Sequence, residues 1–157
     1  MNTEITMRSP DQTATLAEQI GRHLGPGDCL LLVGPVGAGK THFARHLIQS
    51  QMREPEDVPS PTFTLIQTYD TDIGEVWHAD LYRLGSLEEV EELGLQDALD
   101  NAICLIEWPE ILGPLTPDSA LTLEFQTDLT DENTRRVTLN ASSDRWEPLL
   151  ELLANDT

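Results

Sequence analysis

The sequence predicts a three-layer α/β domain with a mixed, mostly parallel sheet, and three observations support this prediction. Helical patterns of apolar residues occur near both ends of the chain. Two continuous apolar runs, at 29–33 and 102–106, have the length and composition of strands buried on both faces. Two pairs of segments rich in β-branched and aromatic residues add antiparallel strands. Helices around such strands must cover both faces of the sheet.

Length and charge point to one globular domain spanning residues 1–157. A chain of 157 residues has the usual size of one domain. It carries 28 Asp and Glu against 9 Lys and Arg, and the net charge of −19 opposes direct binding to nucleic-acid phosphates. The sequence shows neither a membrane span nor a signal-peptide pattern. We therefore expect a cytoplasmic protein with no membrane attachment.

The first half of the chain predicts an edge strand, a helix, a buried strand and a second helix. Residues 4–7 form the edge strand. Ser9-Pro10-Asp11 begins the first helix, because proline suits the first turn and an acidic residue complements the helix dipole. Gly25-Pro26-Gly27 ends it. After the buried strand, apolar residues at helical spacing predict a helix over 41–52.

The second half contains more strands than helices. Four segments have strand character and form two antiparallel pairs, 62–69 with 75–81 and 121–125 with 136–140. Ser86 and Glu89 form a capping box that opens a short acidic helix ending at residue 93. Ser143 or Asp144 caps a final apolar helix.

The strongest motif is a phosphate-binding loop. Residues 34–41, GPVGAGKT, fit the pattern G-x-x-x-x-G-K-S/T at every fixed position, after a buried strand and before a helix, as the motif requires. Its glycines allow backbone N–H groups to turn inward around phosphate oxygens, and the helix dipole favours the same anion. Lys40 is expected on the β- and γ-phosphates and the Thr41 hydroxyl on Mg²⁺. The nucleotide contacts predicted within and directly after this loop are Pro35, Val36, Gly37, Ala38, Gly39, Lys40, Thr41 and His42.

Acidic residues at strand ends are candidates for the metal site. Glu107 directly follows four apolar residues, and we interpret it as a metal ligand rather than an ordinary strand-end carboxylate. Asp80 ends another strand and either holds the metal or orients the attacking water. His78, in the same strand, is expected to be structural. Thr62 lies after a proline-rich turn, where it either senses the metal and γ-phosphate or simply leads into a strand.

Base specificity and further contacts rest on weaker patterns. Lys40 is the only lysine of the chain, so the N-K-x-D element that reads guanine cannot exist, and ATP or ADP is favoured. Arg135 and Arg136 are the only adjacent basic residues. One of them is a candidate nucleotide contact, and we assign Arg136, with a plain surface pair as the alternative.

Several motifs in a fixed order resemble one family along nearly the whole chain. The phosphate-binding loop is followed by SPTFTL at 60–65, DLYRL at 80–84, ELG at 92–94 and ICLIEWP at 103–109. This set resembles the bacterial TsaE (YjeE) ATPases of tRNA threonylcarbamoyladenosine biosynthesis. His42 departs from the family pattern, in which a small hydroxyl residue is common after Lys-Thr, and the strong acidity is also unusual.

The resemblance implies a P-loop NTPase-like fold, weak intrinsic ATPase activity and Mg²⁺. It also implies a partnership with the TsaB–TsaD heterodimer, through which tRNA is contacted only indirectly. By analogy, Thr41, Glu107 and Asp80 serve the metal, Lys40 binds phosphate, and Lys40, Thr62, Asp80 and Glu107 form the catalytic set. Asp11, at the start of the first helix, lies where family members help to contain the base.

Two other functions remain compatible with the motifs. A small-molecule P-loop kinase shares the loop, but it usually carries an arginine-rich lid, for which only Arg135 and Arg136 are available. The other is a non-hydrolytic adaptor in which ATP binding alone controls docking.

Overall fold

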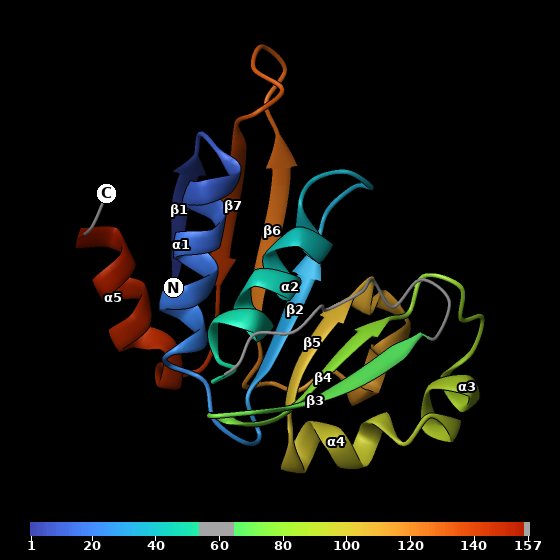
Figure 1. The fold of residues 1–157 in the computed structure, drawn as a ribbon. Helices are drawn as coiled ribbons and strands as arrows, with labels where there is room; N and C mark the ends of the chain where they lie inside the picture. The colour runs from blue at the N-terminus through green and yellow to red at the C-terminus, as the bar shows by residue number, and fades with distance from the viewer. Residues whose placement is uncertain (54–64, 156–157) are drawn as a thin grey trace.

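The computed structural model describes residues 1–53 and 65–155, which build a seven-stranded sheet in the order β1-β7-β6-β2-β5-β4-β3 (Figure 1). The strands are β1 (Asn2–Met7), β2 (Cys29–Val33), β3 (Ile66–Thr71), β4 (Gly74–Asp80), β5 (Ile103–Glu107), β6 (Leu121–Thr127) and β7 (Arg135–Asn140). The helices are α1 (Pro10–Gly21), α2 (Lys40–Ser50), α3 (Leu87–Glu92), α4 (Leu95–Asn101) and α5 (Glu147–Asn155), with 3₁₀ turns η1 (Pro109–Leu115) and η2 (Asp144–Trp146).

The sheet is mixed, as predicted, but its parallel pairs are confined to the centre. Strand β2 runs parallel to β5 and β6, and β4 runs parallel to β5. The outer pairs β1–β7, β6–β7 and β3–β4 are antiparallel. Parallel and antiparallel pairs are thus equal in number among the described strands, which corrects the expectation of a mostly parallel sheet. The hairpins β3–β4 and β6–β7 supply two of the three antiparallel pairs, and the pairing of the edge strand β1 with β7 supplies the third.

Helices cover both faces and complete the three layers. Helices α1, α2 and α5 contribute buried side chains to one core, together with alternate residues of the strands beneath them. Helices α3 and α4 and the η1 turns contribute to a second core on the opposite face. Figure 1 shows α1 and α2 lying side by side over the sheet, with α3 and α4 at its other side near β3, β4 and β5. The predicted three-layer α/β architecture is confirmed.

Local sequence features locate most helix starts correctly. The Ser9 hydroxyl accepts a hydrogen bond from the Gln12 backbone N–H, and Ser86 accepts from Glu89 N–H, so both act as N-caps. Ser143 accepts from Arg145 N–H and caps η2, which leads into α5. The first helix ends at Gly21, four residues before the predicted Gly-Pro-Gly stop. Helix α4 and the η1 turns were not predicted, because each is only seven residues long and, unlike α3, begins without a side-chain N-cap.

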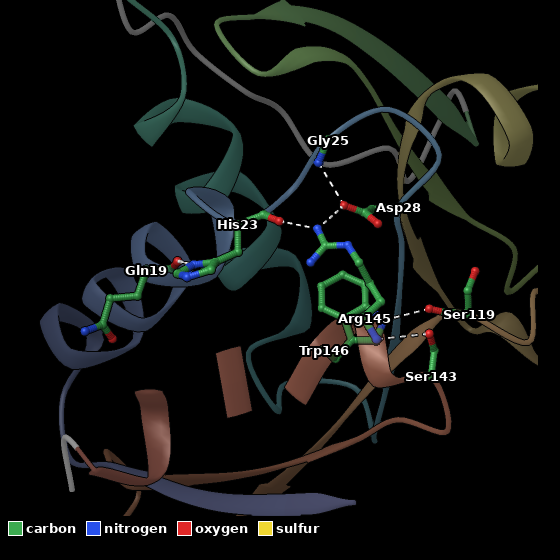
Figure 2. Close-up of polar contacts among 8 residues, drawn as sticks. All are labelled: Gln19, His23, Gly25, Asp28, Ser119, Ser143, Arg145 and Trp146. Carbon is green, nitrogen blue, oxygen red and sulfur yellow. Dashed lines mark hydrogen bonds and ion pairs between the residues drawn. The ribbon is translucent and has the colours of Figure 1, made fainter. Parts of the chain in front are cut away.

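The η2 turn, which leads into the C-terminal helix α5, is joined to the loop between α1 and β2 by a polar cluster (Figure 2). The Arg145 guanidinium donates to the His23 carbonyl and lies 2.7 Å from Asp28 Oδ2, which also accepts from the Gly25 backbone N–H. The buried Trp146 indole donates to the Ser119 carbonyl. These bonds join segments distant in sequence near the start of β2, whereas the phosphate-binding loop leaves the other end of that strand.

The two cysteines pack as small apolar side chains. Cys29 and Cys104 are register partners on β2 and β5, both buried and both free thiols. Burial raises the pKa of the Cys104 thiol to about 12, so it stays protonated and unreactive at neutral pH. The helices in residues 1–53 and 65–155 include none long and apolar enough to span a bilayer.

Candidate functional site

The phosphate-binding loop leaves β2 and enters α2 by way of left-handed glycines. Gly37 has a φ of 83° and Gly39 a φ of 103°, conformations that L side chains rarely adopt. Space around the Cβ position of both glycines is open to 4 Å. At the start of the loop, a Cβ on Gly34 would meet the Phe125 carbonyl oxygen at 2.5 Å. The loop therefore needs glycine at all three positions, and at two of them it leaves room for a ligand.

Lys40 is held inside this loop. Its side chain is buried, and its ammonium donates a hydrogen bond to the Gly34 carbonyl. The same nitrogen lies 3.5 Å from the centroid of the Trp108 ring, a cation–π contact. Trp108 has a φ of 55°, in the left-handed region, which bulky residues occupy only under constraint from their surroundings. The strained residue thus supplies one wall around the amine.

A chain of hydrogen bonds joins α2, β5 and β4 beneath the loop. The Thr41 hydroxyl donates to Glu107 Oε1 at 2.7 Å. The other oxygen of that carboxylate, Oε2, lies 2.7 Å from Nε2 of His78. Glu107 is only 2% exposed and His78 is fully buried. Both oxygens of the buried carboxylate therefore have a hydrogen-bond partner: Thr41 of α2 for Oε1 and His78 of β4 for Oε2.

Asp80 stands beside Glu107 in the sheet. The two residues are register partners on β4 and β5, so both carboxylates lie at the same edge of the sheet. Asp80 Oδ1 accepts from the Tyr82 backbone N–H, which orients the carboxylate at the strand end. No ion pair joins Asp80 to Arg83 within the part of the chain that the structure describes. Thr41, Glu107 and Asp80 thus present three oxygen-bearing side chains in one region.

These groups line a cavity of about 660 Å³ at the carboxyl ends of the central strands. That volume is in the range of small-molecule sites. The loop and its helix form the floor, and the segments after β4 and β5 supply Tyr82, Arg83 and Trp108. The β6–β7 connection closes another side with Glu132, Asn133 and Arg135, while the start of α1 adds Pro10 and Thr13. The cavity therefore combines cations and carboxylates with apolar walls.

Most predicted site residues are brought together there. Those that line the cavity are Val36, Gly37, Ala38, Gly39, Lys40, Thr41, His42, Asp80 and Glu107. Pro35 and Asp11 do not line it, although Pro10 and Thr13 beside Asp11 do. Thr62 lies outside the described residues.

Arg135 lines the cavity and the predicted contact Arg136 does not, and the alternation of side chains along β7 is the reason. Val137 and Leu139 face the core beneath α1, so Arg135 shares their face and its guanidinium reaches the Gly37 carbonyl at 3.4 Å. Arg136 points to the opposite face, and it is absent from the cavity wall. The two arginines are adjacent in the sequence, and they differ only in the face of β7 on which each side chain lies.

Three further residues at or beneath the cavity were not predicted as site residues: Tyr82 and Trp108, which line it, and His78, which is buried beneath it. His78 bonds the key carboxylate, although the residue was expected to be structural. Trp108 and Tyr82, whose rings lie 4.9 Å apart, border the mouth of the cavity. The motif around Glu107 includes Trp108. The contact of its ring with Lys40, however, goes with the left-handed backbone conformation of Trp108, which cannot be read from the type of residue.

Lys40 offers a direct test of this electrostatic environment. Burial lowers the pKa of its ammonium, while Glu107, Asp80 and Glu110 act in the opposite direction. As the only lysine, it produces a single Cε–Hε resonance in protein labelled with ¹³C-lysine. We expect a titration midpoint below the ordinary value of about 10.4. A midpoint at or above that value would contradict the buried placement.

The comparisons with known proteins agree along most of the chain. The family model for threonylcarbamoyl adenosine biosynthesis protein TsaE matches residues 7–137. A curated TsaE protein of Rickettsia felis is 40% identical over 88% of this chain and 80% of its own length. The TsaE protein of Bacillus subtilis is 33% identical over 93% of this chain and 90% of its own. The crystal structure of Bacillus subtilis YdiB superposes with a TM-score of 0.78, at 26% identity, covering 99% of this chain and 96% of that one.

Proposed function

Since the chain belongs to the TsaE family and takes part in tRNA threonylcarbamoyladenosine biosynthesis, we propose that it does so as a Mg²⁺-dependent ATPase. The observation that carries this proposal is the loop of left-handed glycines around the buried Lys40, next to the Thr41–Glu107 pair. The proposed cycle is slow for the chain alone and faster with the TsaB–TsaD heterodimer. Contact with tRNA is made through these partners, since a net charge of −19 opposes direct binding.

The loop supports recognition of a nucleoside triphosphate. Its backbone N–H groups and the N-terminus of α2 form an anion cradle. Lys40 supplies the positive charge on the floor of the cavity, and Arg135 a second one at the side wall. The apolar wall residues Met7 and Phe125 provide surface for a base.

Oxygen-bearing side chains in the cavity fit Mg²⁺. The Thr41 hydroxyl and the carboxylates of Glu107 and Asp80 are hard ligands of the type that this ion prefers. Within residues 1–53 and 65–155 no group of three or more His, Cys, Asp or Glu side chains is arranged to hold a metal. Mg²⁺ usually takes one or two protein ligands together with substrate phosphates and water. When bound, the ion neutralises charge that develops on the transferred phosphoryl group.

The residues of this chain then contribute position and charge. Lys40 and the loop amides would stabilise charge on the γ-phosphoryl oxygens, and Asp80 is placed to orient water. Arg83 and Arg135 are the arginines of the cavity wall. Arg83 is exposed and Arg135 is engaged with backbone carbonyls of its own hairpin and loop. Without an arginine committed to the γ-phosphate, we expect low turnover in the isolated chain.

The proposal is tested by ATP hydrolysis with and without the partners. We expect a slow Mg²⁺-dependent rate for the chain alone and a rise of at least about tenfold on adding TsaB–TsaD, since a supplied arginine or water-positioning group typically accelerates this chemistry strongly. Calorimetry with Mg·ATP should show binding to the isolated chain. Equal rates with and without the heterodimer would refute partner activation, and no heat of binding for folded protein would refute the nucleotide site.

A further inference from the structure

We propose that His78 is a positioning residue that holds the Glu107 carboxylate in the orientation needed for Mg²⁺. The inference rests on the proposed function, because it assigns a residue to the metal region of the same cavity. It rests on a geometric observation: the imidazole of His78 on β4 is fully buried and contacts Glu107, a buried carboxylate beside the phosphate-binding loop.

The contact comes from neighbouring strands of the sheet. His78 shares the face of β4 that carries Val76 and Asp80, because side chains alternate along a strand. Glu107 ends β5, the parallel neighbour, and its register partner is Asp80. His78 therefore lies on the strand next to that of Glu107, two residues before the register partner Asp80. Its Nε2 reaches Oε2 at 2.7 Å.

The orientation of the carboxylate follows from its two donors. A carboxylate only accepts hydrogen bonds, so Nε2 of His78 must carry the hydrogen. Thr41, on α2, donates to the other oxygen. Donors from opposite sides fix the plane of the group and leave its remaining lone pairs for the cavity. Donors such as His78, which bond a ligand of the metal without touching the metal, orient metal-ligating carboxylates in other proteins.

The rest of the imidazole makes no comparable contact. Nδ1 of His78 is buried and has no hydrogen-bond partner among residues 1–53 and 65–155. If His78 only filled space, an apolar side chain of similar volume would serve equally well at this position. The polar contact that the described residues give to His78 goes to the predicted metal ligand. We therefore infer that the bond to Glu107 is the reason for an imidazole at this position.

The test compares two substitutions of nearly equal shape. In H78Q the side-chain amide can still donate to Glu107, whereas in H78M the thioether of similar length cannot. Calorimetry measures ADP affinity with Mg²⁺ and with EDTA, which avoids turnover. We expect H78M to lose about tenfold in the Mg²⁺-dependent gain in affinity and to keep the EDTA value, since loss of such outer partners costs 10- to 100-fold in metal affinity. H78Q should retain the gain within about threefold of the unsubstituted chain.

The outcomes separate a positioning role from a structural one. An unchanged Mg²⁺-dependent gain in H78M would overturn the inference, and so would an equal loss of affinity with Mg²⁺ and with EDTA. If H78M does not fold, H78N replaces it, because its shorter amide matches Nδ1 and cannot reach Glu107; the same results are expected. Absence of binding by the unsubstituted chain would instead refute the proposed function, and the inference would fall with it.

Discussion

Replacing Lys40 with methionine is expected to abolish most nucleotide affinity and turnover while leaving the fold intact. Methionine retains the apolar stem that packs beside Trp108 but removes the charge. Hydrogen bonds to charged groups contribute about 1.5–3 kcal/mol, so Mg·ATP affinity should fall about 10- to 100-fold. Turnover with TsaB–TsaD should fall by about 10² to 10³, the usual effect of deleting one preorganised donor.

The loss of binding in K40M should not be accompanied by a loss of folding stability. Burial lowers the pKa of Lys40, which means that the folded environment disfavours its charged form. We therefore expect the free energy of unfolding of K40M in urea to stay within about 1 kcal/mol of the unsubstituted value. R22M is the matched control, since it removes one positive charge from an exposed residue at the C-cap of α1. If K40M bound Mg·ATP as tightly as R22M, the nucleotide site would be misassigned.

Replacing Glu107 with glutamine is expected to stop partner-stimulated hydrolysis. The substitution keeps the volume of a side chain that is 2% exposed but removes its charge, and its amide nitrogen must face a donor, either Thr41 or His78. Two donors then face each other in the buried hydrogen-bond network of Thr41, Glu107 and His78, and this disturbs the metal region. We expect turnover with TsaB–TsaD to fall by about 10² to 10³. E124Q, on the exposed face of β6, controls for the change in net charge.

The same variant distinguishes an ATPase from an ATP-gated adaptor. Assembly of E107Q with TsaB–TsaD is followed by gel filtration, and modification of tRNA by mass spectrometry of its nucleosides. If hydrolysis drives the cycle, the complex assembles and modification stops. Modification that continues without hydrolysis would establish the adaptor instead. Unchanged hydrolysis in E107Q would show that Glu107 has no role in the metal region.

Features encoded in short contiguous segments were predicted well from the sequence. The loop at 34–41, the buried strand before it and the helix after it follow from residue types within about twenty positions. Ser9 and Ser86 mark helix starts because capping depends on atoms three residues away. Helix α4 escaped prediction because seven residues contain too few turns for a periodic pattern.

The site was less predictable wherever it depends on the position of one strand relative to another. Arg135 and Arg136 differ only in which face of β7 they occupy, and a shift of one residue exchanges the two. The role of His78 depends on β4 lying directly beside β5, with Glu107 one strand away. No spacing along the chain reveals that adjacency, since 29 residues separate the two partners.

The phosphate-binding loop and its lysine could be located from the local sequence, because the conformation of eight successive residues is set by their own glycines and by the adjoining strand and helix. Tertiary structure alone decided which side chains surround that loop. The order of the strands brought Asp80 and His78 to Glu107, and the β6–β7 connection brought Arg135 to Gly37. These are contacts between distant segments, and they form only when the sheet assembles and buries its apolar faces against the helices.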